Sequence, residues 1–296
     1  TNHARSSRDL SIDVSVEAFD PHLGTKSQAE RGREGEADAV VLAMARCFLD
    51  IDVGCPEEHE RSRKGYELAV EYLEKKGHVL GIAPGTKPDV LDGEMRDLVR
   101  ESFGCDPSWS GRASVPPLLF DEPGSLRVGR LVIELFDSRV PKTCENFRCL
   151  ATGERGLGKA SRKPLHYKGA PFHRYVRGKL IQGGDVVKRD GSGGDSIYGG
   201  RFNDEKPGLK LKHGGRGTVA MANSGKNSNT SQFYVTLAEN LRGLDGKHVV
   251  FGRVEEGSMG VLDALERKVA EEGHGGDGGE DPGVPVTIAD CGVLAE

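Results

Sequence analysis

The sequence of 296 residues lacks the features that define several large classes of protein. No stretch approaches the roughly 20 consecutive apolar residues of a membrane-spanning helix. The first ten residues, TNHARSSRDL, hold no apolar run of the kind found in secretory signals. Basic residues are not in excess, since the net charge is -5, and this argues against binding to nucleic-acid phosphates. We therefore expect a water-soluble protein that works without a membrane or a nucleic acid.

The six cysteines form no CxxC pair, and their spacing fits neither a disulfide framework nor a zinc site. Metal binding and redox chemistry are thus not expected. Reduced structural thiols in a cytoplasmic compartment are the favoured interpretation. The cysteines are Cys47, Cys55, Cys105, Cys144, Cys149 and Cys291.

The first part of the chain, residues 1–110, is predicted to form a small α/β domain, with a thioredoxin-like fold as one option. Its apolar residues recur with helical or alternating spacing in several short stretches. For Ala37–Val53 a helix is favoured over a buried strand. The other expected elements are a strand at Asp9–Phe19, a helix at Glu60–Gly77, a strand at His78–Pro84 and a helix at Val90–Gly104. Residues 111–117, rich in Pro, Ser and Gly, mark a linker.

From Leu118 onward the texture of the sequence changes to short β-rich runs separated by glycines. Many short strands with glycine turns are typical of a β-barrel or sandwich. Two helices are expected among them, at Pro141–Gly153 and Gly257–Ala270. The acidic, glycine-rich stretch Glu271–Gly283 is predicted to be a solvated loop, with a metal site around His274 as the less favoured alternative.

Five motifs stand in order in this second part. They are FHRYVRGKLIQGGD (Phe172–Asp185), SIYGGRFNDE (Ser196–Glu205), MANSGKNSNTSQFYVTL (Met221–Leu237), LDGKHVVFG (Leu244–Gly252) and TIADCG (Thr287–Gly292). Together they resemble the cyclophilins, a family of proline cis/trans isomerases. The resemblance covers residues 118–296 and implies an eight-stranded antiparallel barrel capped by two helices. It also implies an isomerase that needs no cofactor.

Rotation about an X-Pro bond is slow because the amide C–N bond has partial double-bond character, with a barrier near 20 kcal/mol. A catalyst must favour the twisted amide, whose nitrogen regains a lone pair. This requires an apolar pocket for the proline ring, a fixed donor near the amide and anchors for the flanking backbone.

The resemblance assigns these roles to particular residues. The central donor is Arg174, whose guanidinium offers several N–H donors and stays charged. Gln182 places the arginine and bonds the substrate backbone, the main chain of Asn223 pairs with the substrate, and His248 lies at the pocket rim. The substrate-contacting positions are Phe172, Lys179, Leu180, Ala222, Gln232, Tyr234, Gly243 and Leu244.

Two positions depart from the family pattern. Lys179 stands where the family has Phe, and a charged stem replaces an aromatic wall, although its methylenes can still cover part of a proline. Gly243 stands at the position of a Trp that matters for cyclosporin-type ligands. We therefore expect a slow isomerase that binds cyclosporin weakly.

Two functions are compatible with this sequence. The first is a peptidyl-prolyl cis/trans isomerase acting on proline-containing peptides or proteins. The second is a largely non-catalytic scaffold whose N-terminal domain docks a protein partner, similar to isomerase-like cyclophilins of the ciliary axoneme, a likeness at the level of fold alone. Within Thr152–Gly169 an expanded basic loop is predicted, solvated in the simpler view and bound to an acidic partner in the other. An RNA-processing cyclophilin is disfavoured because no RNA-binding motif is present.

Overall fold

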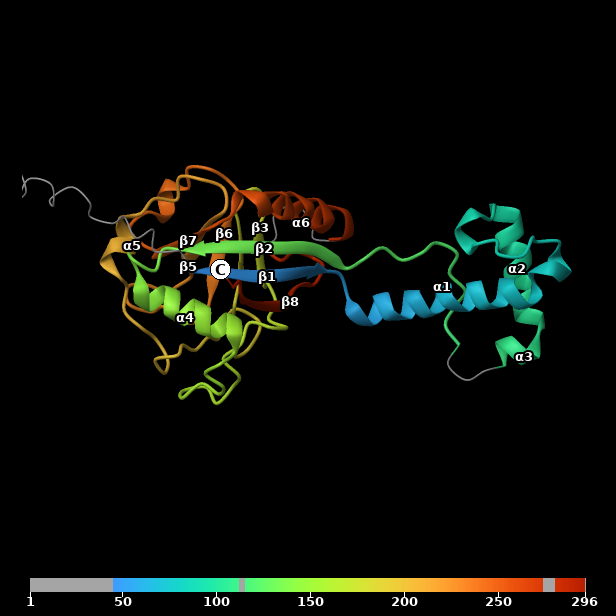
Figure 1. Cartoon of the computed structure of the whole chain (residues 1–296), viewed down its shortest axis with the longest axis horizontal. Helices are drawn as coiled ribbons and strands as arrows, with labels where there is room; N and C mark the ends of the chain where they lie inside the picture. Colours follow the sequence, from blue (N-terminus) through green and yellow to red (C-terminus); the bar gives the residue numbers. More distant parts are fainter. Residues whose placement is uncertain (1–44, 112–114, 274–279, 296) are drawn as a thin grey trace, which may run out of the picture. The chain divides into compact units, whose positions relative to one another are not determined.

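The computed structural model describes residues 45–111, 115–273 and 280–295. Within these ranges the chain forms one eight-stranded antiparallel sheet (Figure 1), in the order β3-β4-β6-β5-β7-β2-β1-β8. The strands are β1 (Arg46–Val53), β2 (Arg127–Leu135), β3 (Arg174–Val176), β4 (Leu180–Gly183), β5 (Thr218–Met221), β6 (Phe233–Thr236), β7 (Val250–Val254) and β8 (Val286–Val293).

Hydrogen bonds between β8 and the segment that leads into β3 close this sheet into a barrel. The N–H of Phe172 donates to the carbonyl of Val286 at 2.8 Å, and Pro171 bridges to Thr287. Alternate residues of the strands point inward, which fills the barrel with apolar side chains such as Leu131, Ile133 and Leu135. The predicted eight-stranded antiparallel barrel is confirmed.

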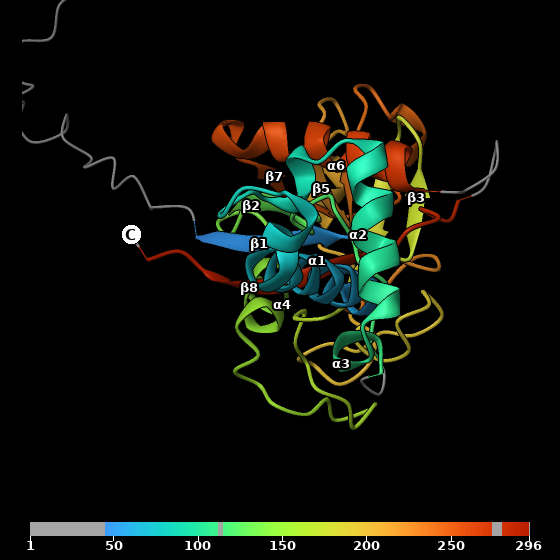
Figure 2. The same ribbon diagram turned by 90° about the vertical axis from the view of Figure 1, so that its right-hand side faces the viewer.

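Two helices cover opposite sides of the barrel, α4 (Pro141–Thr152) and α6 (Met259–Glu272) (Figure 2). Helix α4 begins with Pro141 in its first turn and ends at Gly153, which adopts the left-handed conformation with φ of 71°. Its Phe147 inserts into the barrel and packs against Phe233 with ring centroids 5.2 Å apart. Both helices agree with the sequence prediction to within a turn. A shorter helix, α5 (Lys206–Lys210), precedes β5.

Strand β1 corrects the prediction of a helix at Ala37–Val53. In the described part of that stretch the chain is extended and pairs with β2 on one side and β8 on the other. Cys47, Leu49, Ile51 and Val53 are all fully buried, so the apolar residues follow the two-residue period of a strand. This strand therefore belongs to the barrel and not to a separate N-terminal domain.

Residues between β1 and β2 form a helical unit with a core of its own. It comprises α1 (Pro56–Lys76), η1 (Gly77–Leu80), η2 (Pro88–Val90), α2 (Gly93–Cys105) and α3 (Pro107–Ser110). Tyr72 packs edge-on against both Phe103 and Trp109, with 5.2 Å between centroids in each case. The predicted helices at Glu60–Gly77 and Val90–Gly104 are confirmed by α1 and α2.

The predicted strand at His78–Pro84 is wrong. Its first residues form the turn η1, in which Val79 is 71% exposed. The described residues between β1 and β2 include no strand that could pair with this apolar run, so it has no ladder to join. The unit between β1 and β2 is therefore helical and not α/β.

The predicted strand at Asp9–Phe19 and the alternative metal site around His274 lie outside the described residues. None of the described helices is long and apolar enough to cross a membrane.

Candidate active site

Three neighbouring strands carry one lateral row of predicted site residues, and Ala220 on a fourth strand continues it. Arg174 of β3 lies opposite Gln182 of β4, Gln182 lies opposite Tyr234 of β6, and Tyr234 lies opposite Ala220 of β5. Directly opposite residues in antiparallel strands share one face of the sheet. The register therefore brings the expected donor, its amide neighbour and the aromatic residue together on one surface.

A chain of hydrogen bonds runs along this surface, and its contacts determine which atom of each side-chain amide donates and which accepts. The Gln232 amide Nε2 donates to the carbonyls of Gly191 and Gly193 at 2.8 and 2.7 Å, so its Oε1 is left to accept. It accepts from Gln182 Nε2 at 3.0 Å. The Gln182 Oε1 then accepts from Arg174 Nη1 at 3.2 Å. Backbone carbonyls thus determine the orientation of both amides and offer Arg174 an acceptor.

Arg174 has a second partner that the sequence prediction did not include. Its Nε and Nη2 donate to the two carboxylate oxygens of Glu280 at 2.7 and 2.8 Å. The side chain of Arg174 remains 38% exposed. Gln182 and Glu280 engage three of its five N–H groups, since Nε, Nη1 and Nη2 each donate once, and the other two bond no residue within the described ranges.

An apolar cluster lies beside this row. Its buried members are Leu180, Ala220, Ala222, Tyr234 and Val250, and Leu244 packs against it. Three of the predicted pocket residues, Leu180, Ala222 and Tyr234, therefore share one cluster with Leu244 at its margin. Lys179 and Gly243 are exposed, Lys179 in the turn that joins β3 to β4 and Gly243 in the turn η3 (Arg242–Leu244). The cluster is suited to an apolar ring, with Tyr234 as the aromatic residue among its buried members and Phe136 packed against it.

The hydroxyl of Tyr234 is hydrogen-bonded to His213, which in turn bonds to Asp245. This hydroxyl lies 2.8 Å from His213 Nε2, and His213 Nδ1 lies 3.1 Å from Asp245 Oδ1. Because a carboxylate only accepts, Nδ1 carries the imidazole proton and Nε2 accepts from the Tyr234 hydroxyl. Burial lowers the pKa of His213, although Asp245 opposes this, so the imidazole is neutral. The ring of Tyr234 is thereby fixed in place.

His248 and Asn223 adjoin the cluster: the His248 ring packs edge-on against Tyr234 with 5.4 Å between centroids, and Asn223 follows Ala222 in the chain. His248 Nδ1 lies 3.0 Å from the carbonyl of Met221, so Nδ1 carries the proton and Nε2 can accept. Burial lowers the pKa of His248. The side chain of Asn223 donates to the carbonyl of Lys247 at 3.0 Å. No group of the described residues bonds the main-chain N–H or carbonyl of Asn223, which suits the predicted pairing with a peptide backbone.

Phe172 does not lie at this surface, contrary to the prediction. It is 1% exposed and packs inside the barrel, edge-on to Phe233 at 5.9 Å between centroids. Phe172 belongs to the interior core of the barrel, whereas Tyr234 belongs to the cluster at the row, so the Phe172 ring faces away from a peptide bound there. Gln232 is also buried, at 8% exposure, and its bonds to Gly191 and Gly193 make it a support for Gln182.

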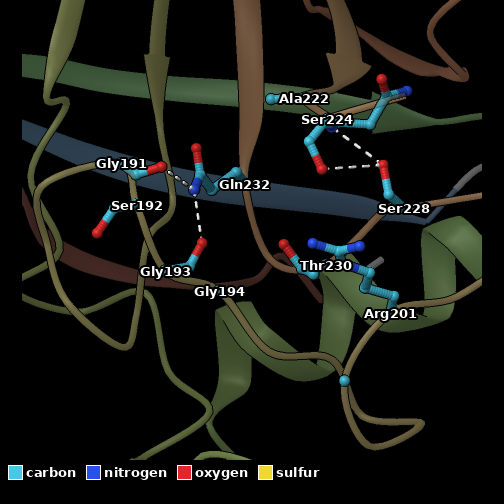
Figure 3. Close-up of a pocket in the computed structure, with 12 residues that line it drawn as sticks. Gly191, Ser192, Gly193, Gly194, Arg201, Ala222, Ser224, Ser228, Thr230 and Gln232 are labelled. Carbon is cyan, nitrogen blue, oxygen red and sulfur yellow. Dashed lines mark hydrogen bonds between the residues drawn. The ribbon is translucent and has the colours of Figure 1, made fainter. Parts of the chain in front are cut away.

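A hollow of about 550 Å³ adjoins the row, lined mainly by glycines and polar residues. Figure 3 shows Gln232 pointing between Gly191 and Gly193 on one side, with Arg201 beside Thr230 on the other. Ala222, Asn223 and Gln232 line this hollow as well. It therefore continues the surface on which the predicted site residues lie.

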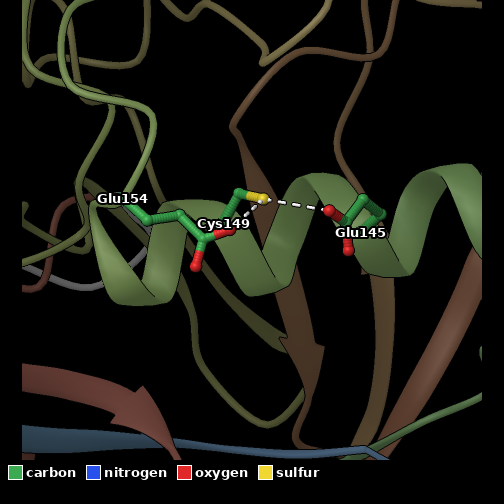
Figure 4. A group of neighbouring side chains, drawn as sticks. All are labelled: Glu145, Cys149 and Glu154. Carbon is green, nitrogen blue, oxygen red and sulfur yellow. Dashed lines mark hydrogen bonds between the residues drawn. The ribbon is translucent and has the colours of Figure 1, made fainter.

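Glu145 and Cys149 of α4 and Glu154, just beyond its C-terminal end, form a separate group whose ligand atoms lie within 4.8 Å of one another (Figure 4). Both carboxylates are already paired with Arg148, at 2.9 and 2.8 Å. Burial raises the pKa of the Cys149 thiol to about 11, so it is protonated at neutral pH. Occupied carboxylates and a thiol make a poor cation site.

The expanded loop Thr152–Gly169 bonds to β8, since the N–H of Gly169 donates to the carbonyl of Ile288 at 2.7 Å, and it also bonds to the segment between β4 and β5, so it is not fully solvated. The Asp195 carboxylate accepts from the N–H of Ser161 at 2.9 Å and from the N–H of Gly200 at 2.6 Å. Arg155, one of its basic residues, pairs with Glu145 at 3.3 Å. The binding of an acidic partner by this loop stays a prediction.

Three residues of the site were missed by sequence reasoning, namely Glu280, His213 and Asp245. No local sequence pattern predicts the hydrogen bond between His213 and Asp245, because the two residues are 32 positions apart in the chain. Glu280 sits 106 residues from Arg174, in a stretch whose composition indicated only a loop. Only the closure of the barrel brings it to Arg174.

Comparison with known proteins agrees with this geometry. Residues 124–293, more than half of the chain, match the family described as cyclophilin type peptidyl-prolyl cis-trans isomerase/CLD. The chain therefore belongs to the cyclophilin family. One relative is the peptidyl-prolyl cis-trans isomerase cyp11 of Rhizopus delemar, 48% identical over 180 residues, which are 60% of this chain and 50% of that protein. The matched region thus spans about half the length of that curated relative.

Proposed function

We propose that this protein is a peptidyl-prolyl cis/trans isomerase acting on X-Pro bonds of peptides or proteins, without a cofactor. The observation that carries the proposal is the lateral row Arg174–Gln182–Tyr234, with its apolar cluster alongside. The cluster accommodates the proline ring, and the main chain of Asn223 anchors the peptide. Arg174 then donates to the amide as it twists, which stabilises the transition state more than the ground state.

The test is an isomerisation assay on a short X-Pro peptide with wild type and Arg174→Ala. Loss of a preorganised donor of this kind costs about 10²-fold in rate. Arg177→Ala is a matched control, because Arg177 is an exposed arginine in the turn after β3. Equal rates for wild type and Arg174→Ala, or no acceleration at high enzyme concentration, would refute the proposal.

Reduced activity is part of the same proposal. Lys179 is exposed, and no carboxylate of the described residues pairs with it, so its stem is free to lie over the cluster. An aromatic ring in its place would bury more apolar area and pack against the proline, worth about 0.5–1.5 kcal/mol, which corresponds to roughly 2- to 13-fold in rate. Lys179→Phe is therefore expected to raise kcat/KM. A wild type that already works at the rate of Lys179→Phe would contradict the reduced-activity proposal.

A scaffold role is the second candidate, favoured by the helical unit between β1 and β2. This unit has its own aromatic core and exposes Val79 and Val90, 71% and 68% accessible. Its test is affinity capture with the whole chain and with a Val79→Asp/Val90→Asp variant. If the protein is a scaffold, the wild type should capture one defined partner and the variant should not, while the isomerase rates of the two proteins stay equal. The cytoplasmic or axonemal location and weak cyclosporin binding stay predictions.

A further inference from the structure

The position of Glu280 is determined by the backbone and not by its side chain alone. The N–H of Tyr175 donates to the carbonyl of Glu280 at 2.7 Å, directly beside Arg174 in the chain. Six residues later the N–H of Phe172 donates to Val286 at 2.8 Å, and Pro282 between them is buried. The segment that closes the barrel therefore brings the Glu280 carboxylate to β3.

The two contacts from Arg174 to Glu280 are the shortest that the guanidinium makes. At 2.7 and 2.8 Å they are charge-assisted and bidentate, whereas the contact to the neutral Gln182 amide is 3.2 Å long. Arg174 holds the pKa of Glu280 below its usual range, so the carboxylate is ionised at neutral pH. Glu280 thus supplies the two shorter contacts to the guanidinium, and Gln182 supplies the longer one.

The pairing geometry leaves Arg174 able to act on a ligand. Glu280 takes the edge formed by Nε and Nη2, and Gln182 takes one N–H of Nη1. The two N–H groups that remain are one on Nη1 and one on Nη2. Without these contacts the Arg174 side chain, which is 38% exposed, would sample many rotamers. Fixing it in one rotamer in the transition state would then cost conformational entropy.

We propose that Glu280 is a positioning residue for the isomerase reaction, which fixes the guanidinium of Arg174 so that its two free N–H groups face the twisting amide. This inference rests on the proposed function of the Arg174 row. It assigns to Glu280 a role in catalysis that acts through Arg174.

The test compares Glu280→Ala and Glu280→Gln with wild type in the isomerisation assay, with kcat and KM determined separately. Glu280→Ala is expected to lower kcat at least fivefold and to change KM less than twofold, because the peptide-binding cluster is untouched. Glu280→Gln keeps one acceptor oxygen and should recover part of the loss. Asp281→Asn is the matched control, since it removes the neighbouring negative charge and keeps an acceptor for the N–H of Gly283.

The Nε–H resonance of Arg174 gives an independent measurement by NMR. It is expected to exchange slowly with water in wild type and in Asp281→Asn, and to exchange rapidly in Glu280→Ala. An unchanged or higher kcat in Glu280→Ala would overturn the inference, and a higher kcat would mean that the carboxylate masks the arginine. If wild type shows no isomerisation at all, the proposed function fails, and the Nε–H measurement still reports on the pairing.

Discussion

Replacing Tyr234 by Phe removes one hydroxyl from the floor of the apolar cluster and leaves the ring in place. That hydroxyl is the donor to His213 Nε2 at 2.8 Å, and His213 is in turn held by Asp245. Tyr234 is 2% exposed and the side chain of His213 is fully buried, so no water replaces the lost donor. The variant therefore leaves one buried imidazole nitrogen without a partner.

An unsatisfied buried acceptor costs about 1–3 kcal/mol. Removal of the hydroxyl also relieves its own desolvation, so we expect a loss near the lower end, about 1–2 kcal/mol. For a protein of this size about 1 kcal/mol corresponds to roughly 2–4 °C in Tm. The melting temperature should fall by about 2–8 °C. The isomerase rate should change less than about twofold, since the ring surface that would contact proline is unchanged.

Denaturant and thermal unfolding of wild type and Tyr234→Phe measure this difference. Tyr175→Phe is the control, because Tyr175 is also buried, at 8% exposure, while its hydroxyl bonds no other residue of the described ranges. A Tyr234→Phe protein as stable as wild type would refute the view that the Tyr234–His213–Asp245 chain holds the cluster. So would an equal loss in Tyr175→Phe.

Two further predictions concern titration and thiol chemistry. Burial lowers the pKa of His173, His213 and His248 below the ordinary 6.5, so below that pH the unfolded chain binds protons that the folded chain excludes. The free energy of unfolding should fall as the pH is lowered from 7.5 to 5.5 and less steeply in His213→Gln; equal slopes would contradict this. Iodoacetamide at pH 8 should label exposed Cys105 and half-buried Cys55 before Cys47, Cys149 and Cys291, whose pKa values burial raises to about 12, 11 and 12, as peptide mass spectrometry will show. Labelling of Cys149 at the rate of Cys105 would count against the buried position of its thiol.

The sequence predicted the elements whose signals are local. The helix Pro141–Thr152 has a proline at its start and a glycine at its end, and the alternating runs after Leu118 indicated short strands. The stretch up to Val53 carried the same two-residue alternation, with Asp50 and Asp52 between inward residues. Its alanine-rich beginning outweighed that signal. Asp50, only 5% exposed, is stabilised by Arg130 at 2.8 Å, a pairing between strands that no local pattern reveals.

In the candidate site, too, the sequence predicted what lies within one motif and missed what depends on tertiary structure. Arg174 and Gln182 are eight residues apart on adjacent strands, and the motif that contains both indicated their proximity. Glu280 reaches Arg174 only through the closure of the barrel, so its role depends on tertiary structure. Phe172 was placed at the surface because it belongs to the motif, yet the chain turns its ring inward beside Phe233.

The insertion of the helical unit between β1 and β2 has a consequence for dissecting this protein. A fragment bounded by the family match, residues 124–293, would lack β1, which lies between β2 and β8. Both neighbours would then present rows of unpaired N–H and carbonyl groups, and such open edges recruit strands from other molecules. A well-behaved minimal barrel must keep Arg46–Val53. Since Asp52 pairs with Arg127, a short hairpin turn can replace the helical unit and rejoin the two strands.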